Sequence, residues 1–196
     1  MTGKGSLNHN SRKFHAKNTD PNRTHWNVEY CNEDIKDVYH ELFDEALKRY
    51  NDKQTRKDRK IDDYYEKIRS GKQEKLFHEV ILQIGDKDNM RSETMEGQLA
   101  AKILDEYMKG FQERNPTLRV FAAHLHLDEA TPHLHIDFIP YVTGSKRGLD
   151  TRVSLKQALS SLGFKGGSRS ETELNQWVQS EKEKLAMVMR ENEIEW

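Results

Sequence analysis

The sequence predicts an α+β fold in which an antiparallel sheet carries helices packed on one of its faces. The main observation is a pair of strand-like runs, residues 120–127 and 133–138, joined by turn-forming residues, which together predict a hairpin. A third run at 77–84, rich in β-branched residues, adds a strand. Segments with apolar residues at helical spacing surround these runs. The predicted order is therefore helix, helix, strand, helix, strand, strand, helix, helix.

The part of the chain before the first predicted strand is expected to begin as loop and then form two helices. Residues 1–30 are polar and rich in Asn, which predicts mostly loops and short turns. Apolar residues then recur at helical spacing from Asn32, the expected cap, to about Tyr50. A charged turn at 51–60 follows, and then a shorter helix that ends at Gly71.

The remaining predicted helices lie on either side of the hairpin in the sequence. Apolar residues between positions 99 and 111 predict an amphipathic helix of about 16 residues. Pro140 is expected to close the hairpin. Ser154 then opens a helix with a capping box, and Gly163 ends it. A final amphipathic helix is expected from about Thr172.

Composition excludes a membrane protein and a disulfide-stabilised one. The chain has 196 residues, 33% of them charged, and a mean hydropathy of −0.99. No apolar run reaches the roughly 18 residues that a membrane span needs, and the N-terminus has no apolar signal region. Cys31 is the single cysteine, which agrees with a reducing compartment. The expected location is the cytoplasm.

The basic residues are concentrated in two segments, although the net charge is only −1. Residues 1–30 contain five Lys or Arg and two Asp or Glu, and residues 141–170 contain six and one. Such segments are where a polyanion would bind, but a solvated charged surface explains them equally well. The basic, glycine-containing loop at 165–169 is either a phosphate contact or a plain linker.

Histidines gather on one face of the predicted hairpin. Successive side chains of a strand point to opposite faces, so His133 and His135 share one face and Leu134 and Ile136 the other. Folding back the preceding strand brings His126 toward this pair. Three imidazoles from adjacent strands form a metal site with open positions, as catalytic sites have, and an incidental histidine cluster is the alternative.

The chemistry of such a site stays open at this point. Neutral imidazoles suit zinc, manganese, nickel or cobalt. The metal could activate water, which is hydrolase chemistry, or polarise a phosphate oxygen for attack by another group, which is nucleotidyl transfer. A nearby nucleophile and phosphate-binding groups would distinguish the second from the first.

Two motifs stand far apart in the sequence. One is His-x-Asp-Glu-x-Thr-Pro-His-x-His at 126–135, with Pro140 behind it. The other comprises His9-Asn10-x-Arg12, then Asn18, Asp20, Arg23 and His25-x-Asn27. Together they resemble the motifs of the MobV family of plasmid mobilization relaxases, the Mob/Pre proteins. This family belongs to the HUH endonucleases, named for a His-hydrophobic-His element that here is His133-Leu134-His135. The resemblance covers almost the whole chain.

The resemblance implies a sequence-specific DNA relaxase. Such an enzyme nicks one strand at a plasmid or mobile-element origin of transfer, stays covalently joined to the 5′ end, and later rejoins the strand. A divalent metal ion, Mn²⁺ or Mg²⁺ above others, is the implied cofactor. The partners are origin DNA, single-stranded or as a hairpin, and a coupling protein of a conjugation system.

The resemblance also assigns roles to individual residues. The implied metal ligands are His126, His133 and His135, and Glu129 is implied as the base or orienter, with Asp128 the less favoured candidate. Contact with DNA is implied for the polar residues Asn10, Arg12, Arg23, His25 and Asn27. Among them Arg12, Arg23 and Asn27 would hold phosphates around the scissile site, and surface salt bridging is the alternative for these three.

Three candidates compete for the nucleophile. The family motif points to His9, whose imidazole could attack phosphorus and give a phosphoramidate. The adjacent Tyr64 and Tyr65 are the rivals, because most HUH enzymes use tyrosine, although their apolar neighbours favour core packing. His25 is the third candidate, and its surroundings favour DNA positioning.

Two alternatives and one departure from the family pattern remain. A three-histidine metallohydrolase or a non-catalytic, metal-stabilised module that binds origin DNA would also use the hairpin. Only eight residues precede His9, so the strand that the family usually has there is expected to be short, missing or replaced. Residues 1–196 are expected to form a single relaxase domain cut from a longer protein. In it, 1–30 carry the nucleophile and bind DNA, and 143–196 form a helical C-terminal extension.

Overall fold

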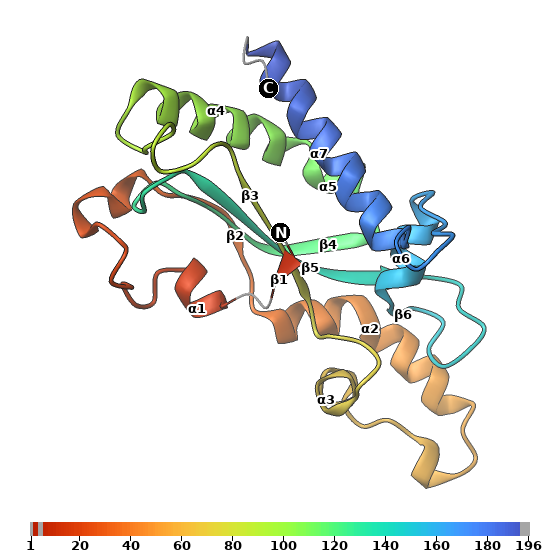
Figure 1. Ribbon diagram of the computed structural model, residues 1–196. Helices are drawn as coiled ribbons and strands as arrows, with labels where there is room; N and C mark the ends of the chain where they lie inside the picture. The colour runs from red at the N-terminus through yellow and green to blue at the C-terminus, as the bar shows by residue number, and fades with distance from the viewer. Residues whose placement is uncertain (1, 4–5, 193–196) are drawn as a thin grey trace.

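The computed structural model describes residues 2–3 and 6–192 and confirms the α+β class. Five strands form an antiparallel sheet in the order β1-β3-β5-β4-β2 (Figure 1). Their bounds are Thr2–Gly3 for β1, Val28–Asn32 for β2, His78–Gln83 for β3, Leu118–His126 for β4 and His133–Val142 for β5. A short strand β6, Arg152–Val153, pairs with the end of β5. The strand expected before the His9 motif is the two-residue β1, which pairs with β3.

The helices connect these strands and extend the chain beyond them. They are α1 (Leu7–Asn10), α2 (Ile35–Asp52), α3 (Tyr64–Ser70), α4 (Met95–Lys109), α5 (Phe111–Arg114), α6 (Leu155–Ser161) and α7 (Glu173–Glu191), with 3₁₀ turns η1 (Pro21–Trp26) and η2 (Lys57–Arg59). No helix in the described ranges is long and apolar enough to cross a membrane.

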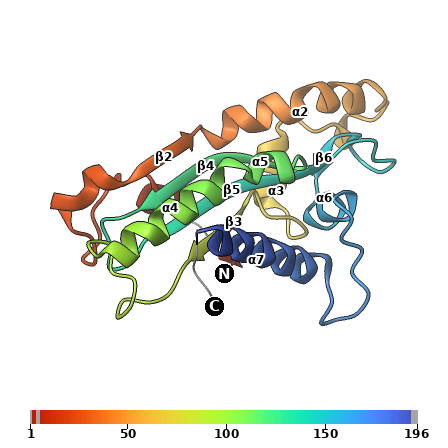
Figure 2. The same cartoon turned by 90° about the horizontal axis from the view of Figure 1, so that it is seen from above.

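Helices cover both faces of the sheet, which corrects the expectation of one covered face. Figure 1 shows α4, α5 and α7 above the sheet and α1, α2 and α3 below it, and Figure 2 shows α4 and α7 lying along it from above. On the upper face Trp177 of α7 packs edge-on against Phe138 of β5. On the lower face α2 and α3 bury Phe121 and Ile139. The part of the lower face that α1 covers carries the histidines.

Two local predictions were wrong for physical reasons. The cap of α2 is Asp34 and not Asn32, because Asn32 is the last residue of the unpredicted strand β2. Pro140 does not close the hairpin but lies within β5, opposite Leu118. The Pro140 carbonyl points away from β4, toward the side where the pairing with β3 has already ended, and accepts a bond from the Ser154 N–H. An N–H at this position would point to the same side, so its absence removes no hydrogen bond between β5 and β3 or β4.

A β-bulge in β4 decides which face His126 occupies. Val120 lies opposite Phe138, and Ala122 lies opposite Asp137, the residue adjacent to Phe138 in β5. Two steps along β4 thus match one step along β5, and Phe121 is the extra residue. Strict alternation from Val120 would place His126 on the face covered by α4. The extra residue reverses the alternation, and His126 comes to lie opposite His133 on the same face.

We expect His78 to lower the free energy of unfolding in acid. Its ring in β3 stacks on Phe138, and burial, together with the charge of Lys75, lowers its pKa from 6.5 to about 4. Between these values the unfolded chain binds the proton and the folded chain does not, so stability is complete above pH 6.5 and declines as the pH falls toward 4. The contribution is at most about 3 kcal/mol.

Denaturant titrations of the wild type and of His78→Gln, measured at neutral pH and near pH 4, test this expectation. The glutamine variant should lose less unfolding free energy on acidification, because the titrating group is gone. An identical loss in both proteins would contradict it.

Candidate active site

The three histidines predicted from the hairpin converge at its closed end. His126 lies directly opposite His133, and His135 is two residues further along β5. The three rings are packed with centroids 4.8 to 5.2 Å apart and are all buried. One nitrogen from each lies within 4.8 Å of the others, which is the spacing of atoms that could bind one metal ion.

Hydrogen bonds fix one nitrogen of each ring and leave the other for a ligand. His133 Nδ1 lies 2.9 Å from the carbonyl of Thr131, and His135 Nδ1 lies 2.7 Å from Glu79 Oε1. His126 Nε2 lies 2.8 Å from the carbonyl of Asn10. Because these partners are acceptors, each bonded nitrogen carries the proton, the arrangement typical of histidines that bind metal.

The unbonded nitrogens fit a divalent cation. His126 Nδ1 and His135 Nε2 are buried and have no hydrogen-bond partner among the described residues. A buried nitrogen without a partner is costly, and a metal ion would satisfy it. Burial also lowers the pKa of His135, and that of His126 to about 3, so both rings are neutral, as metal ligands must be.

A layer of buried polar groups lies under the histidines and joins α1 to the sheet. The Asn10 amide donates to Glu79 at 2.8 Å and to Asp137 at 3.1 Å. Burial and the nearby Glu79 charge raise the pKa of Asp137 to about 7. Burial alone would raise the pKa of Glu79 too, but bonds from His135 and Asn10 outweigh it and lower that pKa. Asn10 therefore fastens the helix that carries His9.

His9, which belongs to α1, lies beside the three clustered histidines. Its ring centroid lies 6.0 Å from that of His126 and 6.5 Å from that of His135. Its Nε2 lies 3.3 Å from Glu129 Oε1, and its side chain is 23% exposed. His9, His126 and Glu129 form a second set of atoms close enough to bind a metal ion. The structure thus brings together His9, from the N-terminal motif, and Glu129, from the motif at 126–135.

Arg12 links the two motifs. Its guanidinium makes two bonds to Asp128, at 2.9 and 2.5 Å, and one to Glu129 at 2.8 Å. Burial raises the pKa of Glu129, but His133 and Arg12 outweigh it and hold the pKa at about 2. Glu129 is therefore ionised at neutral pH. Asp128 is fully buried against Arg12 and does not face His9.

The other residues expected to touch DNA fall into two groups. Asn10 and Asn27 are used inside the protein: Asn27 accepts bonds from the backbone N–H groups of Leu127 and Asp128 at the turn. Arg23 pairs with Asp20 and Glu93 and donates to the Leu127 carbonyl. His25 is exposed and lies against Trp26, so it is free to meet a ligand.

The rival tyrosines lie away from this site. Tyr64 is buried under α2, next to Tyr39 and Phe43, and its hydroxyl accepts a bond from the Val153 N–H. Tyr65 also packs against Tyr39. Both belong to the apolar part of the lower face.

Sequence reasoning missed Glu79. Glu79 lies on the face of β3 opposite to Val80 and Leu82, where a polar side chain is ordinarily exposed, so the strand pattern carries no signal for it. It is buried because Asn10 of α1 and His135 of β5 bond to its carboxylate on this face.

A comparison with sequence families matches residues 5–186 to Mob_Pre, described as plasmid recombination enzyme. The chain belongs to the Mob_Pre family. The resemblance inferred from the two motifs is thereby confirmed. No curated protein matches the chain.

Solved structures show the fold that Mob_Pre members share. The chain is similar to the MobM relaxase domain (MOBV; Mob_Pre) bound to plasmid pMV158 oriT DNA of 22 nucleotides, in a Mn-bound crystal structure at pH 5.5. The identity is 24% and the TM-score 0.51, over 96% of this chain and 79% of that chain. The same complex at pH 4.6 gives 23% and 0.51, over 96% and 80%. The chain therefore shares the fold of that domain.

Proposed function

We propose that this Mob_Pre chain is a metal-dependent DNA relaxase that nicks one strand at an origin of transfer and later rejoins it. The observation that carries the proposal is His9, a partly exposed imidazole that is not one of the three clustered histidines but lies beside them. Family membership and the likeness to the MobM domain, described as Mn-bound and bound to oriT DNA, support it. A hydrolase could use the same histidine only as a base for water, so a covalent adduct separates the two functions.

The proposed metal ligands are His126, His133 and His135, with Mn²⁺ or Mg²⁺ as the ion. When bound there, the ion would polarise the scissile phosphate and offset the charge of the transition state. The protein contributes fixed tautomers, through Thr131 and Glu79, and neutral rings, through burial.

His9 is the proposed nucleophile. His9 Nε2 lies between Glu129 Oε1 at 3.3 Å, which can accept its proton, and Arg12 Nη1 at 3.2 Å, which can only donate. In the tautomer that carries its proton on Nε2, the ring donates to Glu129, and Nδ1 keeps the lone pair that attacks phosphorus. A P–N bond forms, the P–O3′ bond breaks, and the 3′ oxygen leaves and takes a proton from water. The 5′ phosphate stays on the imidazole. Attack by the 3′ hydroxyl on the phosphoramidate reverses these steps and rejoins the strand.

Glu129 acts as an orienter in this proposal and not as a proton acceptor. The Arg12 guanidinium bonded to its carboxylate disfavours protonation of Glu129, so it serves poorly as a base at neutral pH. It can instead hold the Nε2–H of His9 and stabilise the positive charge that appears on the ring when Nδ1 is phosphorylated. Arg12 keeps Glu129 in place.

Exposed aromatic side chains mark where single-stranded DNA would lie. Phe14 is 50% exposed and packs beside His9, and Trp26 is 37% exposed beside His25. Flat exposed rings stack on unpaired bases. We assign His25 and Arg23 to this strand, while Asn10, Arg12 and Asn27 position the protein groups around it.

The remaining expectations complete the proposal. Residues 1–196 would form one relaxase domain, with 1–30 supplying the nucleophile and 143–196 a helical extension. A plasmid substrate places the reaction in the cytoplasm, where a coupling protein would receive the nicked complex. A metallohydrolase or a non-catalytic origin-binding module would share the three histidines but would not form a covalent link.

A plasmid nicking assay tests the proposal. Supercoiled DNA that carries the region around this gene is incubated with the protein and Mn²⁺, and the products are separated with and without protease treatment. We expect nicked circles whose 5′ ends carry protein, and none after chelation. A nick without a protein adduct would indicate hydrolysis, and DNA binding without a nick would indicate the non-catalytic module. Nicking that survives chelation would remove the metal from the mechanism.

A further inference from the structure

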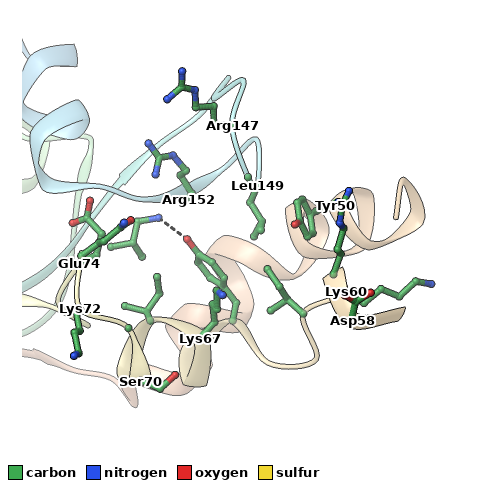
Figure 3. A pocket seen from close by; sticks show the side chains of 18 residues that line it. Tyr50, Asp58, Lys60, Lys67, Ser70, Lys72, Glu74, Arg147, Leu149 and Arg152 are labelled. Atoms are coloured by element: carbon green, nitrogen blue, oxygen red, sulfur yellow. Dashed lines mark hydrogen bonds between the residues drawn. The ribbon is translucent and has the colours of Figure 1, made fainter. Parts of the chain in front are cut away.

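A basic cleft lies at the opposite end of β5 from the histidines. Its volume is about 1000 Å³, and it opens between α3 and the loop that leads into β6 (Figure 3). Six cationic side chains line it: Arg59, Lys60, Lys67, Lys72, Arg147 and Arg152. The carboxylates of its lining are Asp58, which is already paired with Arg56, and Glu74.

The basic surface continues past the loop. A second hollow of about 490 Å³ shares Arg147 and Arg152 with the first and adds Lys146 and Lys165, with no carboxylate in its lining. Lys67, Lys72 and Arg147 are exposed and form no ion pair within the described ranges. Unpaired cations gathered on one surface repel one another, so their positive potential is available to an anion.

The cleft and the histidines share the lower face of the sheet. Leu149 and Val153 of the cleft pack in the same cluster as α2, α3 and Ile139 of β5. From His135 to Tyr141 the strand advances six residues, or about 20 Å at ~3.3 Å per residue. Duplex DNA covers that distance in about six base pairs, at ~3.4 Å per pair.

We propose that this cleft binds the phosphate backbone of duplex or hairpin-stem DNA about six base pairs away from the phosphate that is cut. The assignment rests on the proposed function, because DNA is the polyanion on which that function acts. A duplex fits better than a single strand, since the aromatic residues in the lining are Tyr50 and the buried Tyr64 and offer no open stacking platform. The exposed rings lie instead beside His9 and His25.

Anisotropy titrations with two labelled probes test the cleft. One probe is a duplex of about 20 base pairs, long enough to cover the cleft and the histidines, and the other is an oligo(dT) strand of equal length. The variant Lys67→Ala/Lys72→Ala/Arg147→Ala removes three charges without removing a side-chain hydrogen bond. The matched control, Lys182→Ala/Lys184→Ala/Arg190→Ala, removes three exposed charges from α7 on the opposite face.

We expect the cleft variant to lose at least about tenfold in duplex affinity near 0.1 M salt, with a log–log salt slope smaller by about 2 to 3, because each lost phosphate contact removes about 0.9. The control variant and oligo(dT) binding should change less than about twofold. Equal slopes for both variants would overturn the assignment, and so would an equal loss for oligo(dT).

The outcome is separable from that of the proposed function. Duplex binding at the cleft needs neither His9 nor a metal ion, so the His9→Ala protein should show the same difference between cleft and control variants. If no DNA ever yields an adduct but this difference persists, the relaxase proposal fails and the cleft remains a DNA-binding site. If adducts form and the difference is absent, the cleft assignment fails alone.

Discussion

Replacing His9 by alanine is expected to lower covalent adduct formation by about 10⁴-fold or more, while leaving the protein folded. The imidazole is the proposed attacking group, and its removal leaves no other nucleophile beside the histidine cluster in the described part of the chain. His9 is partly exposed and contributes little to the core, so thermal unfolding should change little. Adducts are counted on denaturing gels with a labelled nicked-strand end.

Two controls separate the nucleophile from its neighbours. His15→Ala changes an exposed histidine in the segment that follows α1 and should leave adducts unchanged. Tyr64→Phe removes a hydroxyl that bonds to the Val153 N–H and should cost stability but not adducts. Adducts that persist in His9→Ala and vanish in Tyr64→Phe would transfer the role to the tyrosine.

Manganese titration of the His9→Ala protein distinguishes two roles for His9. His9, His126 and Glu129 also lie close enough to bind an ion together. If His9 is the nucleophile, its loss abolishes adducts but hardly changes Mn²⁺ affinity. If it is a ligand, the affinity should fall along with the adducts. The first result is expected, because the alternative set leaves His133 and His135 without a metal.

The hairpin could be predicted because its signals are local. Alternation at 133–138, turn formers at 128–132 and a preceding strand are all contiguous in sequence, and the turn is short. The bulge at Phe121 could not be predicted, since Val120–Ala123 is apolar throughout and one extra residue leaves no mark on such a stretch. It nevertheless decides the face of His126. The hairpin pattern therefore predicted the histidine cluster correctly, although it did not show the bulge that brings His126 into that cluster.

The strand β2 was missed because its sequence resembles a loop. Val28–Asn32 has a bulge at Tyr30 and mostly exposed side chains, so it shows no alternation, and a helix begins three residues later. Tertiary pairing with β4 makes it a strand. The role of Asn10 could not be predicted for the same reason. An asparagine suits contact with DNA, but this one is buried because α1 packs against the sheet, and that packing is not visible in the local sequence.

The second large effect is expected at the metal site. His135→Ala should abolish measurable Mn²⁺ binding and, with it, adduct formation. The ring is buried and its Nε2 has no protein partner among the described residues. The set His9, His126 and Glu129 remains in this variant, so residual Mn²⁺ binding would point to that set. Isothermal titration with MnCl₂ measures the binding, and thermal unfolding confirms that the protein is folded. Unchanged binding would exclude His135 as a ligand.

The residue behind His135 should matter in a graded way. Glu79→Gln keeps an oxygen that accepts the Nδ1–H of His135 but removes the charge that makes this imidazole a stronger donor to a metal. We expect Mn²⁺ affinity to fall by about 10 to 100-fold, the usual cost of losing such a partner. Adduct formation should recover at high Mn²⁺, which a lost ligand or nucleophile would not allow.

Asp137→Asn is the matched control for Glu79→Gln. Asp137 is equally buried and is bonded to the same amide of Asn10, but it contacts no histidine. Burial and the Glu79 charge raise its pKa to about 7, so a neutral side chain is already tolerated at this position near neutral pH. If both variants weaken Mn²⁺ binding equally, the cause is the loosening of α1 through Asn10. If only Glu79→Gln does, the carboxylate acts through the ring of His135.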